Sequence, residues 1–177
     1  GEGGCEFGGM VQAMVSTTGY KATLGMISTV AGKGDYIVLD IDGHASIWDG
    51  CKLGDAEVVP FRHNDLGAME ERLKRIPEGA GKLVILEGVY SMLGDIAPLK
   101  EMIAVARKYG AMALVDEAHA TGFIGPNGRG VAGDQGGLVD VDSVVGPLAQ
   151  SVGNGGSLCR CNIPTLWFSR DSCGDRA

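Results

Sequence analysis

Two carboxylates and a histidine follow directly on an apolar run in the second half of this chain. Residues 111–115 read Ala-Met-Ala-Leu-Val, which predicts a buried strand, and Asp116, Glu117 and His119 come next. In open α/β sheets, ligands bind beyond the carboxyl ends of parallel strands, so these ionisable groups would lie where chemistry usually occurs. The alternative is that Asp116 caps a following helix and His119 finishes a loop.

The composition predicts one globular domain: the chain has 177 residues, 45% of them hydrophobic, and a formal net charge of -7. Negative charge without a cluster of Lys or Arg argues against a nucleic-acid or anionic-membrane surface. No apolar run approaches the ~20 residues that span a bilayer, so we expect a cytoplasmic protein without a transmembrane segment. The five cysteines show no C-x-x-C spacing, so we expect no metal site and no disulfide framework.

Along the chain, apolar residues alternate between the period of a strand and that of a helix. The expected strands cover residues 35–40, 57–61, 82–86, 111–115 and 141–145. The expected helices cover residues 20–30, 44–53, 66–76 and 99–109, the last of them closed by Gly110. Helices of this length between strands imply a parallel sheet with right-handed crossovers, and so an α/β fold.

The two ends of the chain differ from this pattern. Residues 1–7 are rich in glycine and hold no pattern, and residues 157–177 show no period that suits a helix or a strand. We therefore expect one domain over residues 1–156. The tail over residues 157–177 would be either disordered or the product of an altered reading frame.

Several short motifs occur in order through the first 156 residues. They are Ser28 to Asp35, His44 to Ile47, Phe61 to Asp65, Glu87 to Met92, Asp116 to His119, and the glycine-rich loop Gly125 to Gly130. As an ordered set they resemble the α-oxoamine synthases, pyridoxal-5′-phosphate enzymes of fold type I. The closest resemblance is to bacterial members that condense serine with a palmitoyl thioester. It implies a three-layer α/β/α fold with a mostly parallel sheet, the large domain of this fold type, here incomplete.

The resemblance implies roles for four side chains of the site. Asp116 would face the pyridine nitrogen of pyridoxal 5′-phosphate and keep it protonated. His119 and Ser91 would contact the phenolic oxygen of the cofactor. His44 would stack over the ring and could also touch the substrate carboxylate.

Backbone groups would hold the cofactor phosphate. Gly19 and Tyr20 begin a helix, so their N–H groups would lie at its positive end. His63, in an Arg-His-Asn-Asp turn, is expected to be solvated. Gly43 and Thr23 stand where the family usually has Asn.

The main departure from the family lies in residues 146–153, Gly-Pro-Leu-Ala-Gln-Ser-Val-Gly. The family has Gly-Thr-Phe-Ser-Lys-Ser there, and its lysine forms the Schiff base with the cofactor and then moves the α-proton. Gln150 occupies the lysine position, and an amide nitrogen is neither nucleophilic nor basic. Pro147 and Ala149 replace two hydroxyl residues that bind phosphate, each worth ~1 kcal/mol or more. We therefore expect weakened cofactor binding and no catalysis by the chain as it stands.

Three functions remain open. The first is the family reaction, in which an amino acid, serine in the first place, joins an acyl thioester with loss of carbon dioxide. The second is a non-catalytic partner of an active homologue, which Gln150 favours, because family sites form at a dimer interface; we expect a homodimer or a dimer with a homologue. The third is a degenerate or truncated gene product, because family members are more than twice as long and carry a C-terminal domain with a substrate-binding arginine.

Overall fold

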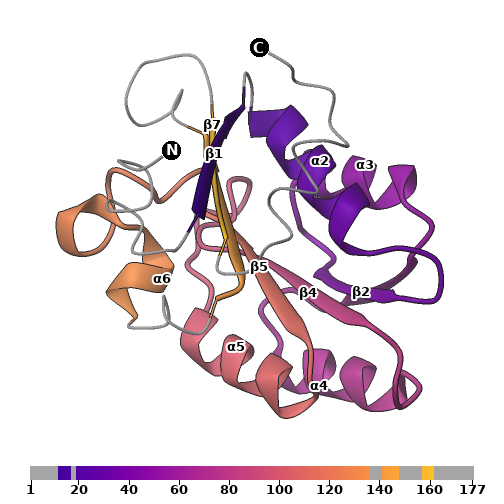
Figure 1. Cartoon of the computed structure of the whole chain (residues 1–177). Coiled ribbons are helices and arrows are strands. Elements are labelled where there is room, and N and C mark those ends of the chain that lie inside the picture. Colours follow the sequence, from indigo (N-terminus) through magenta and orange to yellow (C-terminus); the bar gives the residue numbers. More distant parts are fainter. Residues whose placement is uncertain (1–11, 17–18, 136–140, 148–156, 162–177) are drawn as a thin grey trace.

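The strands of the computed structural model form one sheet (Figure 1). The structure describes residues 12–16, 19–135, 141–147 and 157–161. Among these residues, seven strands follow the order β1-β7-β6-β5-β4-β2-β3 across the sheet. The strands are β1 (Gln12–Ser16), β2 (Tyr36–Asp40), β3 (Glu57–Phe61), β4 (Lys82–Glu87), β5 (Met112–Asp116), β6 (Ser143–Pro147) and β7 (Ser157–Cys161).

The strands β3, β2, β4, β5 and β6 are neighbours in this order and run parallel. This confirms the predicted α/β fold with a mostly parallel sheet. The helices of the described chain are α2 (Gly19–Val30), α3 (Ala45–Leu53), α4 (Leu66–Arg75), α5 (Leu99–Lys108), the short α6 (Val131–Asp134) and the 3-10 turn η1 (Pro126–Gly128). In the part of the chain that the structure describes, none of the helices has the length and apolar character needed to cross a membrane.

Helices cover both faces of the sheet, with α4 and α5 on one side and α2 and α3 on the other (Figure 1). Successive side chains of a strand point to opposite faces, so an apolar strand such as β4 contributes to two cores. Val84 and Leu86 belong to the core on the side of α4 and α5. Leu83 and Ile85 belong to the core on the side of α2 and α3. Burial on both faces explains why β4 reads as a continuous apolar run.

The helix α5 illustrates how local sequence determines an element. Four buried side chains recur at helical spacing along it: Leu99, Met102, Ile103 and Ala106. Gly110 follows the helix with a φ of 68°, a left-handed conformation that glycine adopts without strain. The N–H groups of Gly110 and Ala111 donate to the carbonyls of Arg107 and Ala106, which closes the helix as predicted.

Two strands at one end of the sheet are absent from the predicted pattern. The strand β7 pairs antiparallel with both β1 and β6. The expectation that the sequence from residue 157 onward fits neither helix nor strand is therefore wrong for residues 157–161. These five residues belong to the same sheet as the domain that we expected to end at residue 156. Residues 1–7 and 162–177 lie outside the described residues.

A buried carboxylate anchors the loop that follows β5. Glu117 has no exposed surface, and its two oxygens accept the backbone N–H groups of Val131 at 3.1 Å and Ala132 at 2.8 Å. Gly130 passes close to this carboxylate, because a Cβ added there would lie 2.7 Å from Cδ of Glu117. The φ of Gly130 is 91°, so glycine is required both for its conformation and for the space.

We expect Gly130→Ala to lower the free energy of unfolding more than Gly34→Ala. Gly34 has the same φ of 91°, but nothing lies within 4 Å of its Cβ position. The Gly34 variant therefore carries backbone strain alone, ~1–2 kcal/mol. The Gly130 variant adds a clash with a buried side chain, which costs a further ~1–3 kcal/mol. Urea denaturation measures both losses, and equal losses would contradict a role for the contact with Glu117.

Candidate cofactor site at the carboxyl edge of the sheet

Three buried acidic side chains lie where three neighbouring parallel strands end. Asp40 ends β2, Glu87 ends β4 and Asp116 ends β5, and their exposed fractions are 1%, 3% and 6%. The strand β4 lies between the other two, and Glu87 pairs in register with Asp116. Buried carboxylates so close together repel one another when ionised. The site must therefore supply hydrogen-bond donors, cations or protons.

Asp116 accepts hydrogen bonds from two parts of the chain. One oxygen accepts the backbone N–H of Ala118 at 2.9 Å, and the hydroxyl of Thr23 on α2 donates to the same carboxylate. Burial raises the pKa of Asp116 to about 6, while the N–H of Ala118, the charge of His44 and the Thr23 hydroxyl act in the opposite direction. Residues 117–125 form turns and bends, so the alternative that Asp116 caps a helix is wrong.

Glu87 lies beside Asp116. One of its carboxyl oxygens accepts the backbone N–H of His44 and so fixes the position of the backbone at His44. Burial raises the pKa of Glu87 to about 8; the N–H of His44 lowers it, and the charges of Asp116 and Asp40 raise it further. At neutral pH this carboxyl is therefore mostly protonated, which reduces the repulsion at Asp116. Glu87 is not among the site residues predicted from sequence, although its position directly after a buried apolar run is a signal for one.

His44 and His119 lie within electrostatic reach of each other. His44 caps the first turn of α3, where its Nδ1 is 2.8 Å from Oγ of Ser46 and accepts the backbone N–H of Ser46 at 3.2 Å. Burial lowers the pKa of His119, and His44 lowers it further when its own ring is protonated. The charge of His44 also acts on Asp116. The structure thus brings three of the predicted site residues together at one edge.

The other predicted site residues have fewer described contacts. Ser91 is exposed in the turn that follows β4, at the same edge of the sheet. Gly19 and Tyr20 form the start of α2, as predicted, and the Tyr20 hydroxyl donates at 2.7 Å to a carboxylate on α3. Gln150 lies outside the described residues. The strand β6, which precedes it, runs parallel to β5 and ends at the same edge.

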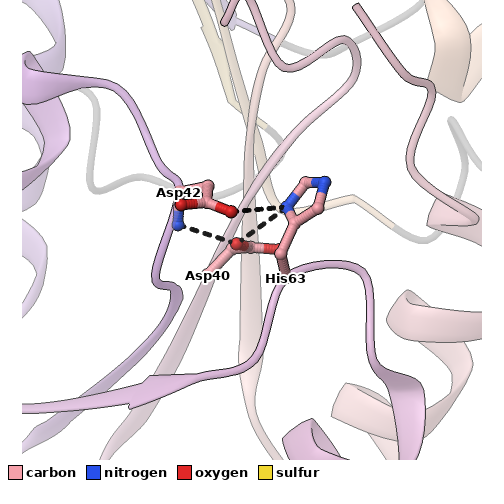
Figure 2. Close-up of side chains that lie close together, drawn as sticks. All are labelled: Asp40, Asp42 and His63. Carbon is pink, nitrogen blue, oxygen red and sulfur yellow. Dashed lines mark hydrogen bonds and ion pairs between the residues drawn. The ribbon is translucent and has the colours of Figure 1, made fainter. Parts of the chain in front are cut away.

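The prediction that His63 is solvated is wrong. Its Nδ1 lies 3.1 Å from Oδ1 of Asp40, its Nε2 lies 2.8 Å from Oδ2 of Asp95, and its side chain is 18% exposed. Figure 2 shows the ring beside Asp40 and Asp42. The position of Asp40 at the end of a buried strand can be read from the sequence and could have indicated a partner for His63. Asp95 is 32 residues from His63, and no local spacing links the two.

Known proteins match this chain in sequence and in fold. A serine palmitoyltransferase from Sphingomonas paucimobilis is 57% identical over 168 residues, which cover 95% of this chain and 40% of the relative. An 8-amino-7-oxononanoate synthase from Geobacter metallireducens is 41% identical over 151 residues, which cover 85% of this chain and 39% of the relative. A solved structure of a serine palmitoyltransferase variant from S. paucimobilis, with a bound pyridoxal-phosphate–myriocin aldimine, is 57% identical with a TM-score of 0.92; the match covers 96% of this chain and 42% of that one.

The chain spans about two-fifths of the length of these proteins. Their similarity confirms the predicted resemblance to α-oxoamine synthases and the incomplete large domain of fold type I. The family model for aminotransferase class I and II matches residues 7–153, which is most of the chain. The serine palmitoyltransferase structure contains pyridoxal 5′-phosphate, the cofactor of these enzymes. The protein therefore belongs to the aminotransferase class I and II family, which depends on this cofactor.

Proposed function

We propose that this chain is the cofactor-binding part of a pyridoxal-5′-phosphate-dependent acyltransferase. The reaction would condense an amino acid with an acyl thioester and release carbon dioxide, as in sphingoid-base synthesis. The observation that carries the proposal is the grouping of His44, Asp116 and His119 at the carboxyl edge of a sheet of this family. We choose serine as the amino acid because the serine palmitoyltransferase is 57% identical to this chain and the 8-amino-7-oxononanoate synthase 41%.

The side chains at this edge suit the pyridine ring of the cofactor. When bound, a protonated pyridine ring withdraws electrons from the bonds at the substrate α-carbon. Asp116 would face the ring nitrogen, because a buried carboxylate with a pKa of about 6 is mostly ionised at neutral pH and holds a proton on its partner. His119 and Ser91 would contact the phenolic oxygen, and His44 would cover the ring face.

The phosphate would bind at the start of α2, because the N–H groups of Gly19 and Tyr20 lie in a first helical turn and lack partners within the helix. Pro147 and Ala149 cannot add the hydroxyl donors of the family, at a cost of ~1 kcal/mol or more each. Gln150 can neither attach the cofactor covalently nor move a proton. We therefore infer that the chain holds the cofactor weakly, without a covalent bond, and is inactive as it stands.

Gln150 also favours a second function, that of a non-catalytic partner of a lysine-bearing homologue. Large apolar side chains are exposed on the loops after β4 and β5: Met92, Leu93, Ile96 and Phe123. Exposed apolar groups on one edge are typical of protein interfaces, so we infer a dimer with a second copy or with an active homologue. A gene for an intact lysine-bearing homologue beside the gene for this chain would favour the partner over a degenerate gene product.

Removal of the Asp116 charge should weaken cofactor binding. Asp116→Asn keeps the shape of the side chain but cannot pair with a protonated ring nitrogen, so the dissociation constant for pyridoxal 5′-phosphate should rise about tenfold. Fluorescence titration of the 177-residue chain measures this constant. Asp55→Asn, at an exposed position, removes the same charge as a control. Equal affinities of the Asp116 variant and the unaltered chain would contradict the placement of the ring nitrogen.

Restoring the family residues should restore covalent attachment of the cofactor. We expect Pro147→Thr, Ala149→Ser and Gln150→Lys together to give an adduct at position 150 that borohydride makes permanent, detected by mass spectrometry. The variant with only Pro147→Thr and Ala149→Ser is the control and should give no adduct. An adduct on any lysine of the unaltered chain would contradict the role given to Gln150.

Glu87 should make the fold less stable as pH rises. The pKa of Glu87 is 4.5 when solvated and about 8 in the fold, so the folded state holds this proton more tightly. Its contribution to stability is therefore complete below pH 4.5 and is lost as pH rises to about 8. The loss should be roughly 2–4 kcal/mol.

The variant Glu87→Gln cannot ionise but can still accept the N–H of His44. Chemical denaturation between pH 5 and pH 8 should give a flatter stability profile for this variant than for the unaltered chain. Glu57→Gln makes the same change at an exposed position and is the control. Parallel profiles for Glu87→Gln and the unaltered chain would show that Glu87 is ionised throughout this range.

A further inference from the structure

The imidazole of His63 lies between two carboxylates. Nδ1 is 3.1 Å from Oδ1 of Asp40, and Nε2 is 2.8 Å from Oδ2 of Asp95. An ionised carboxylate only accepts hydrogen bonds, so both contacts are hydrogen bonds only when each ring nitrogen carries a proton and the ring is a cation. The ring of Tyr90 packs edge-on against it, with 4.6 Å between the ring centroids. Burial lowers the pKa of His63, but the hydrogen bonds and negative charges of Asp95 and Asp40 raise it more.

The same group of side chains has the spacing of a metal site. The donor atoms of Asp40, Asp42 and His63 lie within 4.8 Å of one another (Figure 2). A metal would have to displace the proton from the ring nitrogen that it binds, and with it the hydrogen bond from that nitrogen to its carboxylate partner. Asp40 is also engaged by backbone donors, since its oxygens accept the N–H groups of Asp42 at 3.0 Å and Asn64 at 2.9 Å. The arrangement is therefore that of an ion-pair network.

One side of this network determines the path of the chain to His44. The side chain of Asp40 accepts the backbone N–H of Asp42, and the backbone carbonyl of Asp40 accepts the N–H of Gly43 at 3.0 Å. The next residue is His44, whose N–H donates to Glu87. Holding Asp40 in place therefore determines where His44 emerges at the edge of the sheet.

The other side of the network determines the turn that carries Ser91. The backbone carbonyl of Asp95 accepts the N–H of Tyr90 at 3.1 Å, and the carbonyl of Tyr90 accepts the N–H of Gly94 at 2.7 Å. Ser91 lies inside the turn that these bonds close. Asn64, next to His63, also donates to Oδ2 of Asp95 at 2.8 Å. Holding Asp95 in place therefore holds the whole turn.

We propose that His63 is a positioning residue that connects the loop ending at His44 to the turn carrying Ser91, and so keeps both beside Asp116. The inference rests on the proposed function for what His44 and Ser91 contact, but the connection itself can be tested without cofactor. The titratable groups that face the ring are Asp40, Asp42, Tyr90 and Asp95, and the charge of His63 also acts on Glu87. On the loop of His63 itself, Arg62 and Asp65 pair with each other. Above its pKa the ring loses one proton, so one of its two carboxylate partners loses a donor.

Nitrogen-15 NMR of the imidazole tests the charge of His63 in the unaltered chain. At pH 7 we expect both nitrogens of His63 to carry a proton. One unprotonated nitrogen at pH 7 would overturn the proposal. Addition of Zn²⁺ alone should leave the His63 signals unchanged, and a Zn²⁺-dependent shift would overturn the ion-pair interpretation in favour of a metal site.

Amide hydrogen exchange tests the connection. A glutamine side chain cannot donate to both carboxylates, so His63→Gln should speed the exchange of amides 43–44 and 90–94 about tenfold. Asp95→Asn removes one charge and keeps the shape, and should speed the same amides less. Arg62→Gln is the matched control, because the Arg62 side chain is 83% exposed and pairs only loosely, at 3.7 Å, with a carboxylate of its own loop. Unchanged exchange in both His63→Gln and Asp95→Asn would overturn the proposal.

Titration with pyridoxal 5′-phosphate separates this inference from the proposed function. If the unaltered chain does not bind the cofactor, the proposed function fails, and hydrogen exchange still decides whether His63 connects the two loops. If the unaltered chain binds it, His63→Gln should raise the dissociation constant about tenfold, while Arg62→Gln should not change it. An unchanged constant despite faster exchange in His63→Gln would overturn the positioning role.

Discussion

Burial of three acidic side chains at one edge of the sheet is the constraint on which the rest of the site depends. Asp40, Glu87 and Asp116 end the neighbouring parallel strands β2, β4 and β5, and each is less than a tenth exposed. A parallel sheet covered by helices forces its strand ends to share an edge, so these groups cannot separate. Each charge must therefore be offset by a donor, a cation or a proton where it stands.

The three groups are stabilised in three different ways. Asp116 is stabilised by donors, from the backbone of Ala118 and from a hydroxyl on α2. Glu87 is mostly protonated at neutral pH, because its pKa is raised to about 8. Asp40 is paired with a cation, His63, and with two backbone donors. Of the three groups, Asp116 is therefore the one that is ionised at neutral pH and also lies next to the exposed His44. An ionised carboxylate in this position suits a cationic ligand.

Local patterns predicted most of the fold. The period of apolar residues was sufficient for β2 to β6 and for α2 to α5, because each of these elements buries a face of its own sequence. The strands β1 and β7 were missed, and neither carries a distinctive local signal. The strand β1 pairs with β7 across 141 residues or more of chain, and β7 also pairs with β6. Of the candidate site, Asp116 and His44 were proposed from motifs. The roles of His63 and Glu87 were missed because their partners are 32 and 43 residues distant, respectively.

In the part of the chain that the structure describes, the side-chain contacts that shape this edge come from segments that precede β6. Among the described residues, the hydrogen bonds of Asp116, Glu87 and His63 come from α2, from the ends of β2, β4 and β5, and from the loops that follow β2 to β5. We propose that Gln150 stands where the family has a lysine, and such a replacement removes a nucleophile and a base. Under the proposed function, ring binding and covalent attachment would be separate properties of this fold. The first would depend on the carboxyl ends of β2, β4 and β5, and the second on the residue at position 150, beyond β6.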